Sequence, residues 1–241
     1  DVVSGNLTSW NPSPNDQVES LKERDGILYV GGRFDRFGKS GSNWIPLNHT
    51  TVQLGFSGDS PDDEVLASVT DGNGGWYIGG DFSEVGGQSR NRLAQIDASG
   101  QVTDWNPDVN GVNNFVSSLL LRNGILYVGG SFTEIDGEER IRLAAFDALS
   151  GNLTSWNPRA GGKVNTIEES NGTIYVGGSF LSVGEFGSFA APLDIVSGEV
   201  DFSLVSPNGE VRAVAADGSG GWYIGGLFTE VGGEPRNHLA Q

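Results

Sequence analysis

Tyr29-Val30-Gly31-Gly32-Arg33-Phe34 occurs five times in the chain, with small changes. The other copies span residues 77–82, 127–132, 175–180 and 223–228, and each begins with tyrosine and ends with phenylalanine. The 241 residues include five tyrosines, so every tyrosine belongs to a copy, at intervals of 48, 50, 48 and 48 residues. This period predicts a repeat protein, with propeller blades or a solenoid as the first candidates.

Each repeat has room for four short strands. In the unit that spans residues 64–111, we expect strands at 65–69, 75–82, 92–97 and 102–105. The first two strands are separated by dipeptides that accept the left-handed conformations of tight hairpins, among them Asp25-Gly26, Asn123-Gly124 and Asn171-Gly172. These two strands are therefore expected to pair antiparallel.

The second strand of a repeat is apolar or small on both faces. In residues 27–34, Ile, Tyr and Gly on one face alternate with Leu, Val, Gly and Phe on the other. Such a strand lies between packed layers, and paired glycines let neighbouring sheets of a propeller approach closely. We therefore predict an all-β fold: one β-propeller of five blades, each with four antiparallel strands.

The blades are expected at residues 16–63, 64–111, 112–162, 163–209 and 210–241 plus 1–15. The division of the last blade rests on an identity, because residues 4–12 repeat residues 150–158, which end the third blade. The N-terminal segment is thus expected to form the outer strand of the last blade. This strand would close the ring and remove the exposed sheet edges.

The repeat resembles a known family in several separate motifs. These are Asn-Gly-x-Leu-Tyr-Val-Gly-Gly-x-Phe, Arg-Asn-Arg-Leu-Ala, Asp-x-x-Ser-Gly and Trp-Asn-Pro. Together they resemble the bacterial delta-60 repeat propellers and are more distantly similar to the repeats of fungal cortical cell-polarity markers. The resemblance covers the whole chain, although blades 1 and 4 lack Arg-Asn-Arg and Trp-Asn-Pro. It implies a propeller of secreted or cell-surface proteins, without a shared catalytic motif.

The composition excludes several classes of partner. With 31 acidic and 14 basic residues, the net charge of -17 excludes a non-specific binder of nucleic acid and disfavours an anionic membrane surface. No apolar run approaches the length of a membrane span, so membrane insertion is not expected. The absence of cysteine excludes disulfides, thiolate nucleophiles and thiolate metal sites. We expect no cofactor, and a chain that is monomeric or part of a longer protein.

The sequence does not carry a recognisable catalytic centre. There is no Gly-x-Ser-x-Gly motif, and His49 and His238 lie at different positions of their repeats. The turns at Asp71 and Asp217 offer oxygen ligands for calcium, but a hairpin turn is favoured. We predict a non-enzymatic binding or scaffold propeller for a protein or carbohydrate. A carbohydrate hydrolase or lyase at the propeller mouth and a purely architectural repeat are the alternatives.

Two sets of residues are candidates for a binding site. The first is the set of equivalent arginines Arg90, Arg140 and Arg236, which either pair with the recurring carboxylates Glu84, Glu134 and Glu230 or capture an anionic ligand. The second is a set of aromatic residues at loop positions of blades 1 and 4: Trp44, Phe186 and Phe189. An exposed aromatic on a rigid loop anchors a sugar ring or a partner side chain, and local repacking is the alternative.

Overall fold

The computed structural model describes residues 17–24, 27–32, 44–48, 61–111, 114–184, 188–201, 205–219 and 221–241. Within these ranges every helix or strand is a β-strand. In the first three strands the side chains described are those of Val18 and Val30, and the rest is backbone. No helix in the described part of the chain could cross a membrane. The all-β prediction is confirmed.

Five three-stranded antiparallel sheets follow one another along the chain. The first three consist of β1 (Val18–Arg24), β2 (Ile27–Gly32) and β3 (Trp44–Asn48); β4 (Val65–Thr70), β5 (Trp76–Gly80) and β8 (Leu93–Ile96); and β10 (Phe115–Arg122), β11 (Ile125–Ser131) and β14 (Leu143–Asp147). The last two consist of β15 (Val164–Ser170), β16 (Thr173–Gly178) and β17 (Ala190–Asp194); and β18 (Val211–Ala216), β19 (Trp222–Gly226) and β22 (Leu239–Ala240). In each sheet the middle strand carries the Tyr-x-Gly-Gly sequence.

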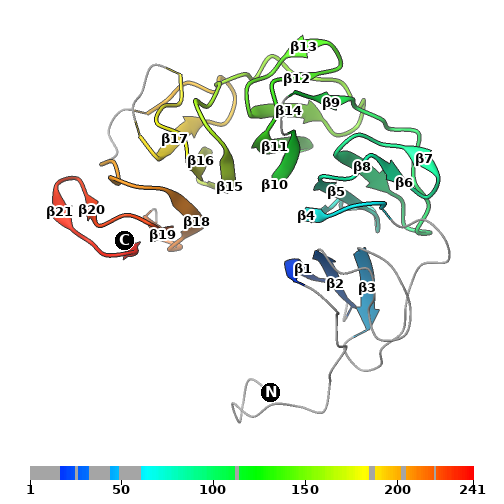
Figure 1. Ribbon diagram of the computed structural model, residues 1–241, viewed down its shortest axis with the longest axis horizontal. Helices are drawn as coiled ribbons and strands as arrows, with labels where there is room; N and C mark the ends of the chain where they lie inside the picture. Colours follow the sequence, from blue (N-terminus) through cyan, green and yellow to red (C-terminus); the bar gives the residue numbers. More distant parts are fainter. Residues whose placement is uncertain are drawn as a thin grey trace, which may run out of the picture.

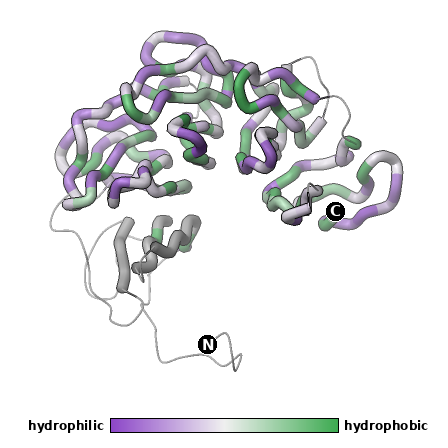
Figure 2. The backbone as a smooth tube through the Cα atoms, turned by 180° about the vertical axis from the view of Figure 1, so that it is seen from behind, coloured by the Kyte–Doolittle hydropathy of each residue, from purple (hydrophilic) through white to green (hydrophobic). Residues whose placement is uncertain are grey.

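Short ribbons follow the middle strands of the second, third and fifth sheets. They consist of β6 (Glu84–Val85) with β7 (Gln88–Ser89); β12 (Glu134–Ile135) with β13 (Glu138–Glu139) and β9 (Val109–Asn110); and β20 (Glu230–Val231) with β21 (Glu234–Pro235). In the third sheet the ribbon thus also pairs with β9, which precedes that sheet in the chain. Figure 2 shows that the ribbon of the last sheet is mostly hydrophilic, whereas the strands leading to it are more apolar. The ribbons thus place polar loops at the rim of the molecule.

The sheets are arranged as an arc around a common centre, with their first strands innermost (Figure 1). Along this arc β1 contacts β4, β4 contacts β10, β10 contacts β15 and β15 contacts β18. The fan of sheets around one axis is the arrangement of propeller blades. The described strands form an arc and not a closed ring, and the segment expected to close it, residues 1–15, lies outside the described residues.

The hairpins between the first and second strands of the third and fourth sheets form as expected, and the predicted turn at Asp25-Gly26 lies outside the described residues. Asn123 and Gly124 have φ angles of 52° and 77°, and Asn171 and Gly172 have 53° and 82°, as the two-residue hairpin of mirror-image type I requires. In the second sheet the turn is longer, and Asp71 Oδ1 accepts the backbone N–H groups of Asn73 and Gly75, both at 2.8 Å. The Asp71 carboxylate therefore holds a turn, as the sequence favoured.

The fourth strand is shorter than predicted in the second, third and fourth repeats, where the structure describes it. Residues 102–105 were expected to form it, but the structure has a single bridge between Ile96 and Val102. Equivalent single bridges join Phe146 to Leu153 and Leu193 to Val200. The physical reason lies in Trp105, whose ring packs edge-on at 5.1 Å from the Tyr77 ring and 5.4 Å from the Phe146 ring. In the second repeat, this position of the ring between two sheets accounts for the short pairing after Val102.

The core lies between consecutive sheets. Tyr127 and Leu143 of the third sheet pack with Val164 and Ile167 of the fourth, and all four are buried. A Cβ atom on Gly129 would lie 2.7 Å from Val164 Cγ1 and 2.8 Å from Ile167 Cδ1, so only glycine fits at this contact. The same relation joins two further glycine and valine pairs, Gly79 with Val116 and Gly177 with Val211. The Gly-Gly motif therefore has the packing role expected from the sequence.

The outward face of the last sheet is uncovered. Tyr223 is 44% exposed, whereas the equivalent Tyr77 and Tyr127 are 3% and 2% exposed beneath the following sheets. Leu239 is 67% exposed, and its buried equivalents are Leu93 and Leu143. The sequence of the last sheet thus provides the same apolar face as the other sheets, without a described sheet against it.

Candidate binding site

The arginines of the second and third repeats are buried structural ties. Arg90 is 6% exposed, and its Nη2 donates to the carbonyl of Thr103 at 2.6 Å. Arg140 is 8% exposed, and its Nη2 donates to the carbonyl of Thr154 at 3.1 Å. Each guanidinium therefore fastens the outer segment of its repeat to the rim ribbon.

The recurring glutamates that were expected to pair with Arg90 and Arg140 are not the partners of these arginines in the structure. Arg140 Nη2 lies 2.9 Å from Glu138 Oε2, whereas Glu134 is paired across the ribbon with Glu139. Among the described residues Arg90 has no carboxylate partner, and its Nη2 donates to Gln88 Oε1. The register of the ribbon thus brings the residue two positions before the arginine, and not the recurring glutamate, beside the guanidinium.

Arg236 differs from its two equivalents. It is exposed, and its Nη1 donates to the carbonyl of Pro235, as the equivalent Nη1 groups do with their preceding residues. No described carbonyl takes the place that Thr103 and Thr154 have in the other two repeats. In the sequence, that position corresponds to Thr8, which lies outside the described residues.

The three candidate aromatic residues have different environments. Phe189 is half-buried and packs against the cluster of the last sheet that includes Val211 and Trp222. Trp44 begins β3, where its backbone pairs with Gly31, and its side chain lies outside the described part of the molecule. Phe186 lies outside it as well. The structure therefore places Phe189 in the packing between the fourth and fifth sheets.

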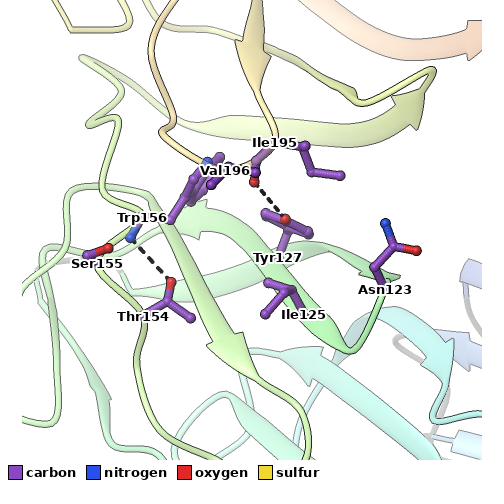
Figure 3. A pocket seen from close by; sticks show the side chains of 8 residues that line it. All are labelled: Asn123, Ile125, Tyr127, Thr154, Ser155, Trp156, Ile195 and Val196. Carbon is purple, nitrogen blue, oxygen red and sulfur yellow. Dashed lines mark hydrogen bonds between the residues drawn. The ribbon is translucent and has the colours of Figure 1, made fainter.

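A groove of about 210 Å³ lies between the third and fourth sheets (Figure 3). It is lined by the side chains of Asn123, Ile125, Tyr127, Thr154, Ser155, Trp156, Ile195 and Val196. The Tyr127 hydroxyl donates to the carbonyl of Ile195 at 2.9 Å, which ties the two sheets together. The Trp156 backbone N–H donates to Thr154 Oγ1 at 3.2 Å and fixes the opposite wall.

The groove offers aliphatic surface and keeps its aromatic rings buried. Tyr127 and Trp156 are 2% and 3% exposed and pack edge-on at 5.2 Å, whereas Val196 is 81% exposed. Leu193 belongs to the same buried cluster as Trp156. It is equivalent in sequence to Phe146, which packs with Trp105 in the preceding interface. The third ring of that aromatic stack is therefore replaced here by a smaller side chain.

Sequence reasoning missed this groove because its walls come from two repeats. Ile195 and Val196 occupy a turn that reads Ala98-Ser99 in the second repeat, and this apolar pair was the available signal. The buried environment of the groove is also visible in its tyrosine. Burial, reinforced by the carboxylates of Glu169 and Asp194, raises the pKa of Tyr127 to about 12.

Residues 72–102 match the model of a family described as "Domain of unknown function (DUF5122) beta-propeller". The repeat is a β-propeller repeat. The match covers one unit, from the turn before β5 to the bridge at Val102, and it confirms the resemblance to a propeller repeat family. A comparison with curated proteins finds no match.

Several solved structures, one of them described as a propeller domain, are similar to the chain in fold. The WD40 beta propeller domain of Doa1 is 15% identical over 88% of this chain and 62% of that one, with a TM-score of 0.55. The extracellular domain of a one-component system from B. thetaiotaomicron is 15% identical, with a TM-score of 0.53, and covers 86% of this chain and 25% of that one. The computationally designed Ika4 protein is 14% identical over 76% and 94% of the two chains, with a TM-score of 0.51. At these identities the likeness concerns the fold alone.

The raised pKa of Tyr127 predicts a specific loss of stability in alkali. A phenol whose pKa is raised from 10.0 to about 12 on folding contributes stability below pH 10 that is lost as the pH rises through 12. Tyr127→Phe lacks the bond to Ile195 and should unfold about 1 kcal/mol more easily at neutral pH. From pH 10 to 12 the melting temperature of the parent should therefore fall relative to that of Tyr127→Phe, so that the advantage of the parent disappears and then reverses. A constant difference over this interval would contradict the raised pKa.

Proposed function

We propose that the chain is a non-enzymatic binding propeller of a secreted or cell-surface protein, with a protein as its partner. The propeller fold supports a scaffold role, because rigid sheets hold rim loops and inter-sheet grooves in fixed positions. The B. thetaiotaomicron relative in fold is described as an extracellular domain, which agrees with the setting that the repeat family implies. The acidic surface, with a net charge of -17, suits a soluble and highly hydrated molecule.

The observation that carries this proposal is the aliphatic groove between the third and fourth sheets. A sugar is usually held by an exposed aromatic face, but Trp156 and Tyr127 are almost fully buried. The accessible surface includes Val196, beside Ile125 and Ile195, which suits a leucine, isoleucine or similar side chain of a protein. No carboxylate lines the groove, so it lacks the pair of acids that a carbohydrate hydrolase uses.

Selection from a displayed library of random peptides would test this function. Enriched peptides should share an aliphatic residue, and Val196→Asp should weaken their binding at least about tenfold because it places a charge at the apolar anchor site. The matched control is Leu149→Asp, since Leu149 occupies the equivalent turn of the third repeat and is 98% exposed. Its binding should be unchanged, and both variants should melt like the parent.

One outcome would contradict the proposed site, and another would contradict the proposed class of partner. Peptides whose binding is equally strong in Val196→Asp would bind elsewhere, so the groove would not be the site. Binding to a glycan array, without any enriched peptide, would instead favour the carbohydrate reading.

We also propose that the propeller is a ring of five four-stranded blades, in which residues 1–12 form the outer strand of the last blade. Three features support this closure. The segment 4–12 is identical to 150–158, Arg236 has no partner equivalent to Thr154 in the described residues, and Tyr223 and Leu239 expose a face that is covered in the other sheets. In the closed ring, the Arg236 guanidinium donates to the carbonyl of Thr8 and the first sheet covers Tyr223.

Closure predicts that Arg236 and the N-terminal segment stabilise the fold together. In the full chain, Arg236→Gln should destabilise by about 2 kcal/mol, the typical value for a hydrogen bond from a charged group. In a chain that begins at Ser13 the same substitution should have little effect, whereas Arg140→Gln should destabilise both chains. Chemical denaturation of the four variants measures these differences. Equal effects of Arg236→Gln with and without residues 1–12 would refute closure, and a dimer in gel filtration would show that the segment pairs between two copies.

A further inference from the structure

The first strand of every sheet carries a β-bulge at the same place. In the second to fifth sheets the register shifts between Val65 and Ala67, Val116 and Ser118, Val164 and Thr166, and Val211 and Ala213. The additional residues are Leu66, Ser117, Asn165 and Arg212. A bulge turns the side chain of its extra residue away from the regular alternation of the strand, and such bulges are frequent beside binding sites.

The four bulge residues converge on one cavity. Together with Lys163 and Glu210, they line a space of about 440 Å³. They come from β4, β10, β15 and β18, or from the residues directly before these strands, which are innermost in the arc of Figure 1. The volume lies within the range of about 300–1,000 Å³ that is typical of small-molecule sites.

The residue type at the bulge differs between the sheets, whereas the valine before it is the same in all of them. The residue before the bulge is valine in all five sheets, and in the third, fourth and fifth sheets this valine packs on a glycine of the preceding sheet. The bulge residue is different in each: Glu19, Leu66, Ser117, Asn165 and Arg212. The repeated scaffold therefore supports a central lining in which each blade supplies its own chemistry.

The described residues that line the cavity include two cations and one carboxylate, and the side chain of Glu19, the bulge residue of the first sheet, lies outside the described part of the molecule. Lys163 is exposed, its ammonium lies 4.9 Å from the centre of the Phe115 ring, and it forms no ion pair with any residue that the structure describes. The Arg212 side chain is 60% exposed, and its Nε lies 3.7 Å from Glu210 Oε1, beyond hydrogen-bond distance. Glu210, the one carboxylate among the described lining residues, already accepts a hydrogen bond from Asn165 Nδ2 at 2.9 Å.

Some polar groups of the cavity lining are hydrogen-bonded within the protein, whereas others keep donors for a ligand. The Ser117 hydroxyl donates to the carbonyl of Val164, and the Asn165 amide donates to Glu210 and to the carbonyl of Val211. The guanidinium and ammonium ends of Arg212 and Lys163 keep most of their donors for another molecule. The chain has 31 acidic and 14 basic residues, so an excess of cations among the described lining residues is a local exception.

We propose that this central cavity binds a small molecule through an oxyanion group, carboxylate or phosphate, held between Lys163 and Arg212. The planar guanidinium fork matches both groups, and the lysine adds a second positive charge. This site is separate from the groove between the third and fourth sheets. Its ligand and that of the groove can therefore be tested independently.

Titration calorimetry of the full chain at low ionic strength, with succinate and with inorganic phosphate, tests the proposal. At least one of the two probes should bind saturably, and the stronger of them identifies the oxyanion. Lys163→Gln and Arg212→Gln should each weaken that binding at least about tenfold. The matched control is Arg159→Gln, because Arg159 is 52% exposed, pairs with the exposed Glu139 and lies outside the cavity lining. The control should bind like the parent.

A substitution that strengthens binding keeps the test independent of folding losses. Glu210→Gln removes the competing carboxylate but retains an oxygen for Asn165, so it should bind the same probe several-fold more tightly. The proposal is wrong if neither succinate nor phosphate binds saturably. It is also wrong if Arg159→Gln weakens binding as much as Lys163→Gln and Arg212→Gln do, since this would indicate a general effect of net charge.

Discussion

The contact on which the rest of the structure depends is the seating of a valine from one sheet on a glycine of the preceding sheet. Gly129 receives Val164, and Gly79 and Gly177 receive the equivalent valines. Farther from the axis, Tyr127 and Trp156 fill the same interface with large rings, and the tyrosine hydroxyl reaches a carbonyl of the next sheet. Small residues near the axis and large ones near the rim make each interface a wedge. Successive wedges turn the sheets around a common centre, as in a propeller.

This wedge accounts for the two places where another molecule fits. At the axis the first strands converge, and the bulge after each valine directs a variable residue such as Asn165 or Arg212 into a central space. Toward the rim the interface widens, and the smaller Leu193 stands at the position that an aromatic ring has in the preceding interface. One site is therefore polar and cationic, and the other is aliphatic. Both are held by the repeated core, so their side chains can vary without altering the packing.

The sequence was most informative where a local rule fixes the backbone. Asn123-Gly124 predicted its hairpin because only a few residue types adopt two successive positive φ angles, and the Gly-Gly motif predicted close sheet packing. It was least informative where two repeats meet. The fourth strand was overestimated because the ring of Trp105 is drawn into the next interface, and Glu134 was mispaired because the ribbon register sets the partner of Arg140. The groove and the central cavity depend on such contacts between repeats, which spacing along the chain does not reveal.

A double-mutant cycle between Gly129 and Val164 measures the central contact directly. Gly129→Ala places a methyl group against Val164 and Ile167, and overpacking of this kind costs about 1–3 kcal/mol. Val164→Ala removes the methyl groups that the new side chain meets. We expect the double variant to be more stable than the sum of the single effects by at least about 0.5 kcal/mol in chemical denaturation. Additive effects, or a Gly129→Ala protein as stable as the parent, would contradict the claim that this glycine sets the approach of neighbouring sheets.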